Sequence, residues 1–264
     1  MTVQELYNAL ETRIPRSLSC PWDNDGMSVS SNPQAKVTGI VVALDLTEEV
    51  IRRAKETGSN VILTHHPLLF KGIKTAVYDQ NPLSNKVVDL IQNGISAMAF
   101  HTRLDTLDGG VNDTLADLLG LEDVTSFGDC DNPQGKAMGR IGSLPSPMAM
   151  ADFVALVKAR LHAKGVAFAD CGKMISRVAV LGGSGGDDLD LAAAAGADVY
   201  VTGELKYHQF CDAPDSHMSV VAAGHDSTEY PICAVLSLMA SEICTMAGEV
   251  IPVSMVKPSA IQHI

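Results

Sequence analysis

Short apolar runs of strand character alternate with amphipathic segments along this chain, and that alternation constrains the fold more than any other feature. In the first half, three expected strands are each followed by an expected helix; in chain order the segments are 37–44, 47–57, 60–64, 82–93, 95–100 and 111–119. Strands and helices that alternate through short connections are typical of a mostly parallel sheet covered by helices. The sequence therefore predicts an α/β protein.

The segments on either side of this series follow the same pattern. A helix at 3–14 opens the chain, and a turn-rich loop with the only tryptophan, Trp22, follows it. Asp45, with Glu48 three residues later, is expected to cap the helix at 47–57. A polar, glycine-bearing segment after Gly120 is the best candidate for the boundary between two α/β lobes. Beyond it we expect strands and helices at 138–143, 148–163, 176–183, 187–195, 198–203, 218–224, 227–246 and 249–253.

Charge and composition exclude several classes of function. Lys and Arg number 19 against 31 Asp and Glu, and the formal net charge of −12 argues against broad nucleic-acid binding or an anionic membrane partner. The first 14 residues lack the apolar core of a signal peptide, and the apolar runs are far too short to span a membrane. The six cysteines form no C-x-x-C pair. We expect a reduced, cytoplasmic protein.

Histidines and carboxylates cluster where predicted strands end. Three of the strands end in histidine, and two of these histidines have a carboxylate four residues later; the residues are His65, His66, His101, Asp105, His225 and Glu229. Because ligands of open α/β sheets gather at the carboxyl ends of strands, these side chains are expected to meet at one edge. Imidazole and carboxylate together suit zinc, manganese or iron. A single catalytic zinc needs about three protein ligands, so this larger set favours two divalent ions per subunit.

A glycine-rich turn, LGGSGGDD at 181–188, is the other motif between a strand and a helix. Such turns can bind phosphate through backbone N–H groups. Gly183 and Gly185 fit the first two positions of the dinucleotide fingerprint, but Asp188 occupies the third. The sequence therefore favours a tight turn over a dinucleotide site.

Five ordered motifs carry a resemblance to a known family. They are DNDGM at 23–27, THHP at 64–67, HTRLD with GGVND at 101–113, TGE at 202–204 and GHDSTE at 224–229. From residue 3 to about residue 252, the chain resembles the dinuclear metal-centre family of GTP cyclohydrolase 1 type 2 homologues, the NGG-interacting-factor-like proteins. It departs from the family pattern at Arg103, where HTNLD has Asn, and at Asp25, which replaces a small apolar residue.

The resemblance implies a ligand set and an architecture. The implied metal ligands are His65, His66, Asp105, His225 and Glu229. The implied fold has two similar α/β lobes with mostly parallel or mixed sheets flanked by helices. Residues 1–127 would form the first lobe and 128–223 the second, while 224–264 would return to complete the first. The family also implies a ring-shaped homohexamer whose metal sites face an internal cavity.

Two hypotheses about function remain open. The leading one is metal-dependent hydrolysis of a nucleotide or heterocycle, in a cyclohydrolase-like reaction. In it, His101 orients Asp105, because metal ligands usually need such a partner. Glu204 and His208 are candidates for proton transfer or substrate contact.

The first hypothesis also suggests residues that bind the substrate, whereas the second needs no substrate. If the substrate is a nucleotide, Lys206 and Arg103 are expected to bind its phosphate. The rival hypothesis is a non-enzymatic assembly that stores or delivers metal ions, or acts as a scaffold for partners.

Overall fold

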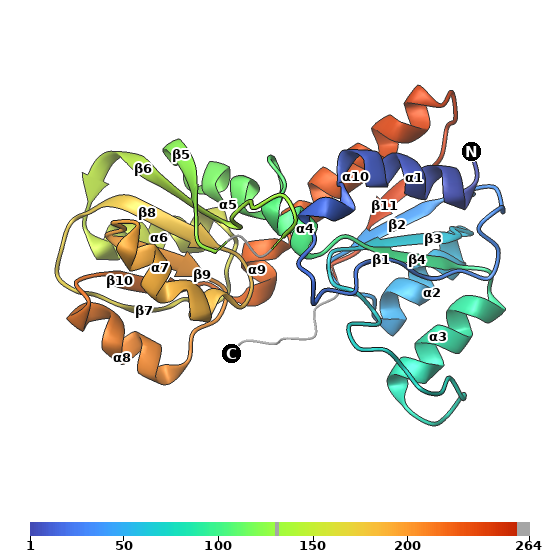
Figure 1. Cartoon of the computed structure of the whole chain (residues 1–264), viewed down its shortest axis with the longest axis horizontal. Coiled ribbons are helices and arrows are strands. Elements are labelled where there is room, and N and C mark those ends of the chain that lie inside the picture. Colours follow the sequence, from blue (N-terminus) through green and yellow to red (C-terminus); the bar gives the residue numbers. More distant parts are fainter. Residues whose placement is uncertain (130–131, 258–264) are drawn as a thin grey trace. The chain divides into compact units, whose positions relative to one another are not determined.

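The computed structural model describes residues 1–129 and 132–257, and the chain forms two compact units (Figure 1). The first unit contains Met1–Leu104 and the segment that begins at Ile232, and the second contains Asp105–Pro231. Residues 258–264 of the expected C-terminal segment lie outside the described residues.

The first unit is built on a five-stranded sheet with the order β1-β4-β3-β2-β11. Four of its strands run parallel; these are β2 (Ile40–Ala43), β3 (Val61–Thr64), β4 (Ser96–Ala99) and β11 (Val253–Met255). The edge strand β1 (Gly26–Val29) runs antiparallel to β4. Because β11 pairs with β2, the C-terminal segment completes the first sheet, as expected.

Helices cover both faces of this sheet (Figure 1). They are α1 (Val3–Arg13), α2 (Glu48–Thr57), α3 (Pro82–Gln92) and α10 (Ile232–Met246), with a short 3₁₀ turn, η1 (Arg16–Leu18), after α1. The pair α2 and α3 lies on one face, and α1 and α10 lie on the other. Ile51 of α2 and Leu90 of α3 pack with Val41 and Ile62 of the strands. Coverage on both faces explains why these strands are apolar at nearly every position.

The second unit is built on a six-stranded mixed sheet with the order β5-β6-β8-β9-β10-β7. Its parallel centre consists of β8 (Ile175–Leu181), β9 (Val199–Thr202) and β10 (Ser219–Ala222). The antiparallel flanks are β5 (Glu122–Phe127), β6 (Gly139–Met148) and β7 (Ala167–Ala169).

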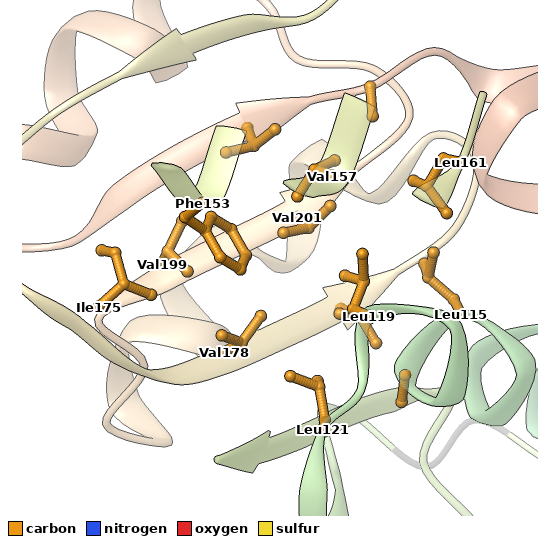
Figure 2. Packing of buried hydrophobic residues seen from close by; sticks show 14 of the residues in the cluster. Leu115, Leu119, Leu121, Phe153, Val157, Leu161, Ile175, Val178, Val199 and Val201 are labelled. Carbon is orange, nitrogen blue, oxygen red and sulfur yellow. The ribbon is translucent and has the colours of Figure 1, made fainter. Parts of the chain in front are cut away.

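Alternating side chains of this sheet fill two separate cores. On one face, α5 (Val111–Leu119) and α6 (Met150–Arg160) pack on Val178 and Val199, and Figure 2 shows Phe153 of α6 in this cluster. On the other face, α7 (Leu189–Ala194) and α8 (Tyr207–Asp215) pack on Ala179 and Tyr200. Adjacent strand residues point to opposite faces, so each central strand contributes to both cores. The predicted α/β class with mixed sheets flanked by helices is confirmed.

Two short helices lie where the chain changes unit. The chain leaves the first unit within α4 (Thr102–Thr106), and it ends the second just after α9 (His225–Glu229). The lobe boundaries expected at 127/128 and 223/224 stay a prediction. The polar segment after Gly120 forms β5, which pairs with β6 inside the second unit.

Two predictions about helices are wrong. The helix expected at 227–246 is two helices, because Pro231 lacks the N–H that a continuous helix needs and follows α9 almost directly. The cap of α2 is Thr47 rather than Asp45: the Thr47 hydroxyl accepts a hydrogen bond from the Val50 N–H at 3.3 Å. Among the described helices, none combines the length and the apolar character that a bilayer span requires.

Candidate metal centre

The first unit gathers three histidines where two neighbouring strands end. His65 and His66 directly follow β3, and His101 lies just after β4. Each offers one ring nitrogen, and the three nitrogens lie within 4.8 Å of one another. The ring centroids are 4.9–5.6 Å apart. Because β3 and β4 are parallel neighbours, their carboxyl ends meet at the same edge, as the sequence predicts.

The second nitrogen of each of these rings is held by an oxygen atom. The Nδ1 contacts are His65 with the Phe100 carbonyl at 3.0 Å, His66 with Asp45 at 2.9 Å, and His101 with Asp23 at 3.0 Å. An Nδ1 that donates its proton to such an acceptor leaves the lone pair of the neutral ring on Nε2. This is the arrangement that protein metal sites use to orient an imidazole ligand.

Asp23 anchors the loop that holds His101. Its carboxylate also accepts hydrogen bonds from the Thr102 N–H at 3.0 Å and hydroxyl at 2.6 Å. Burial raises the pKa of this carboxyl group, but hydrogen bonds and charge from His101 and hydrogen bonds from Thr102 outweigh it and lower the pKa to about 2. Asp23 is therefore a stable anion beside the imidazole. In the sequence, Asp23 is part of the DNDGM motif, which by itself does not indicate this role.

The second unit presents a complementary group of donors. His225 and Glu229 stand four residues apart in α9, and the Nε2 of His225 lies 3.0 Å from the Oε2 of Glu229. The ligand atoms of Asp105 and Glu229 lie within 4.8 Å of each other. On its other side, the Nδ1 of His225 lies 3.2 Å from the Oε1 of Glu204. The His-x-x-x-Glu spacing thus puts both groups on one helical face, as predicted.

The glycine-rich turn packs against the donor pair of α9. A Cβ atom at Gly183 would overlap the Glu229 carboxylate and would lie 3.1 Å from the Nε2 of His225. Gly183 also has a φ of +68°, which side chains rarely adopt. Its N–H donates to the Thr228 hydroxyl at 3.0 Å. The turn, including the 3₁₀ segment η2 (Gly185–Asp188), therefore gives Glu229 the room that a larger residue would take.

Asn112 is a buried polar residue that sequence reasoning missed. It lies in the GGVND motif, and its side chain is almost entirely inaccessible to solvent. Its Nδ2 donates to the Asp105 carbonyl at 3.1 Å, and its Oδ1 accepts from the Gly182 N–H at 2.8 Å. One amide thus ties the backbone of Asp105, in α4, to the glycine-rich turn. The motif was the only signal for it, because its two partners lie far apart in the sequence.

The expected substrate-contact residues lie in different surroundings. Glu204 is exposed and contacts His225, while His208 lies exposed in the first turn of α8. Their catalytic roles stay predictions, as does the expected effect of His101 on Asp105. Lys206 forms an exposed ion pair with Asp187 at 3.2 Å.

The prediction that Arg103 binds phosphate is wrong. Its guanidinium is completely buried, donates to both carboxylate oxygens of Asp25 at 2.7 and 3.0 Å, and pairs with Glu11. It also lies 4.8 Å from the centre of the Phe100 ring. Arg103 and Asp25, the two departures from the family pattern, are therefore partners in one buried ion pair.

The donor chemistry suits divalent first-row metals. Imidazole nitrogens and carboxylate oxygens together fit zinc, manganese or iron, and the Nδ1 contacts of four histidines present Nε2 as the ligand atom. Fold and donors define a class: a two-unit α/β protein with histidine and carboxylate groups that could hold metal ions.

The chain belongs to the Duf34/NIF3 (NGG1p interacting factor 3) family, whose sequence profile matches residues 1–257. A Clostridium perfringens protein named GTP cyclohydrolase 1 type 2 homolog is 34% identical over 238 residues, covering 90% of each chain. The crystal structure of the Staphylococcus aureus protein SA1388 matches with a TM-score of 0.90 at 28% identity, covering 100% of this chain and 99% of that chain. Reduced HcgD from Methanocaldococcus jannaschii has a TM-score of 0.80 at 28% identity and coverage of 96% and 97%. The family resemblance seen in the motifs is confirmed.

Proposed function

We propose that this protein is a metal-dependent hydrolase with a dinuclear divalent-metal centre, acting on a nucleotide or another heterocycle in a GTP cyclohydrolase-like reaction. The name that its curated relatives carry supports this substrate class. The proposed ligands are His65, His66, Asp105, His225 and Glu229. They would hold two divalent ions, which are zinc, manganese or iron.

One observation carries the proposal: the candidate histidines have their Nδ1 atoms held by a carbonyl or a carboxylate. Asp45 supplies the carboxylate for His66, and Glu204 supplies the one for His225. These partners orient the rings and keep Nε2 as the basic atom, which a merely structural histidine does not require. When bound, two divalent ions supply Lewis-acid activation of a water molecule and of the electrophilic centre of the substrate.

The residues around the donors have separate tasks in this proposal. Glu204 holds the His225 ring through Nδ1, and its exposed carboxylate is within reach of solvent for proton transfer. Glu229 and Asp105 would help to hold the two ions, since each carboxylate offers two oxygen atoms. Asn112 holds the backbone of Asp105 through its carbonyl.

Metal stoichiometry tests the ligand set. We expect elemental analysis of the purified protein to find two divalent ions per chain, and fewer than two in Asp105→Ala and Glu229→Ala. His162→Ala, at an exposed histidine of the second unit, is the matched control and is expected to retain both ions. Full occupancy in both carboxylate variants would contradict the assignment.

A turnover assay separates the hydrolase from the non-enzymatic alternative. Metal-loaded protein is incubated with GTP and related heterocycles, and ring opening or phosphate release is followed by absorbance and chromatography. We expect turnover that Glu229→Ala abolishes. Metal that exchanges readily, with no turnover of any of these compounds, would favour storage or a scaffold instead.

We also propose that the chain forms a ring-shaped homohexamer in the cytoplasm. The family resemblance supports the hexamer, and six cysteines without a C-x-x-C pair support a reducing compartment. Light scattering is expected to find six times the chain mass of 27.9 kDa. A monomer or dimer at working concentration would contradict the assembly.

A further inference from the structure

Two large aromatic side chains lie exposed beside the histidine cluster of the first unit. Trp22 is 57% exposed and Phe70 is 46% exposed. Their ring centroids are 6.1 Å apart with an interplanar angle of 60°. Each ring also lies edge-to-face with His101, at 6.3 Å for Trp22 and 6.1 Å for Phe70. Both rings thus adjoin the histidine cluster that contains the proposed ligands His65 and His66.

Hydrogen bonds hold the loops that carry these two rings. Trp22 lies in a turn closed by the Asp23 N–H, which donates to the Cys20 carbonyl at 3.0 Å. The Cys20 N–H in turn donates to the Thr102 hydroxyl at 3.0 Å. The two loops are joined directly, because the side-chain amide of Asn24 donates to the Leu69 carbonyl next to Phe70. Their geometry is therefore set before any ligand arrives.

Exposed aromatic rings at this position fit a flat ligand. Large apolar side chains exposed together usually mark a binding surface. Tilted or stacked aromatic pairs are favourable at centroid separations of 4.5–7 Å, so a third planar ring can pack on either of these two. Stacking recognises a π-face and tolerates different ring substituents.

Because the histidines lie beside the two aromatic rings, this surface fits a small substrate better than an apolar peptide. A substrate whose reacting atom lies at the donors extends only a few ångströms before it reaches Trp22 and Phe70, since both rings contact His101. We propose that Trp22 and Phe70 bind a planar heteroaromatic ring of the substrate and thereby determine specificity. This inference rests on the proposed function, which puts the reacting atom at the histidines.

The intrinsic fluorescence of Trp22 reports on this surface alone, because it is the only tryptophan in the chain. The experiment titrates guanosine into zinc-loaded protein, with ribose as the probe that lacks the ring. We expect saturable quenching by guanosine and none by ribose. Phe70→Leu is expected to weaken guanosine binding about ten-fold, as for a base that loses one stacking partner. Phe70→Tyr is expected to retain it.

Tyr78 provides the matched control, because it lies on the same loop and is 58% exposed. Tyr78→Leu is expected to bind guanosine like the wild type, and all variants are expected to bind the same amount of zinc. Equal guanosine affinity in Phe70→Leu and wild type, or no saturable quenching, would overturn the inference. A third result would also overturn it: Phe70→Leu changes the oligomeric mass, and the wild type does not bind guanosine. The rings would then form a contact between subunits.

The same titration keeps this inference separate from the proposed function. Quenching is measured without turnover, and zinc content is measured independently. A wild type that binds guanosine through Phe70 but holds no metal would defeat the proposed function and leave the ring-binding surface standing.

Discussion

Replacing Asp25 by Ala tests whether Arg103 depends on it as a buried partner. Both side chains are almost completely inaccessible, and Arg103 donates two hydrogen bonds to the Asp25 carboxylate. Burial lowers the pKa of Arg103, but the hydrogen bonds and charges of Asp25 and Glu11 outweigh this effect, so the pKa is raised overall. The guanidinium therefore stays charged, and among the described residues Asp25→Ala leaves it Glu11 as the remaining carboxylate partner.

The magnitude follows from the burial of the pair. Removing one member of a buried ion pair costs about 3–5 kcal/mol, because the remaining charge is desolvated and poorly compensated. Arg103→Asn alone leaves Asp25 buried, and its donors in the described part of the chain are then the Ser19 hydroxyl and the His101 N–H, so a similar loss is expected. The double variant removes both charges. We expect its loss to be smaller than the sum by at least about 2 kcal/mol.

Urea unfolding followed by Trp22 fluorescence measures this, since Trp22 lies in the same unit. With an m-value of about 2 kcal/mol per M, Asp25→Ala should lower the midpoint by about 1.5–2.5 M. Lys55→Gln is the control, because it breaks a partly exposed ion pair with Asp89 and should cost about 0–1 kcal/mol. Additive losses in the double variant, or a midpoint shift for Asp25→Ala no larger than that of Lys55→Gln, would refute the reasoning.

Three further predictions concern the donors and their supports. Gly183→Ala should lower metal affinity at least ten-fold by displacing the Glu229 carboxylate. Gly172→Ala is the control and should leave the affinity unchanged, because Gly172 has a φ of +80° but open space around it. Calorimetric titration with Mn²⁺ compares the two variants. Asn112→Ala should destabilise the second unit by about 1–3 kcal/mol in urea unfolding, because the Asp105 carbonyl and the Gly182 N–H lose a buried partner. Chelation should lower the thermal unfolding temperature, since ions bound only to the folded state stabilise it by about 4 kcal/mol at a thousand-fold excess over Kd. Unchanged unfolding after complete metal removal would contradict this last expectation.

The strands and the histidines that follow them could be predicted because their signals are local. An apolar run that ends in His65 or in His101 identifies both a strand and the residue at its carboxyl end. The elements that were missed have weak local signals: β1 lies within a turn-rich stretch, and β5 carries charged residues on its exposed positions. Their pairing with β4 and β6 determines them, and pairing is a tertiary property.

Asp45 shows the same limit for a single residue. Its position before a helix favours a capping role, but Thr47 caps α2 and Asp45 accepts the Nδ1 proton of His66. Local spacing cannot distinguish these roles, because both need a carboxylate in the same short loop.

The sequence by itself determined the α/β class, the family and the identity of the candidate metal ligands, because periodicity, motif order and donor chemistry are all written along the chain. Only the tertiary structure decided which groups orient those ligands and which charges are buried. Asp23 reaches His101, and Asp25 reaches Arg103, across a separation of 78 residues in each case. The free energy of a buried charge depends on the partner that folding brings to it, and no local pattern contains that partner.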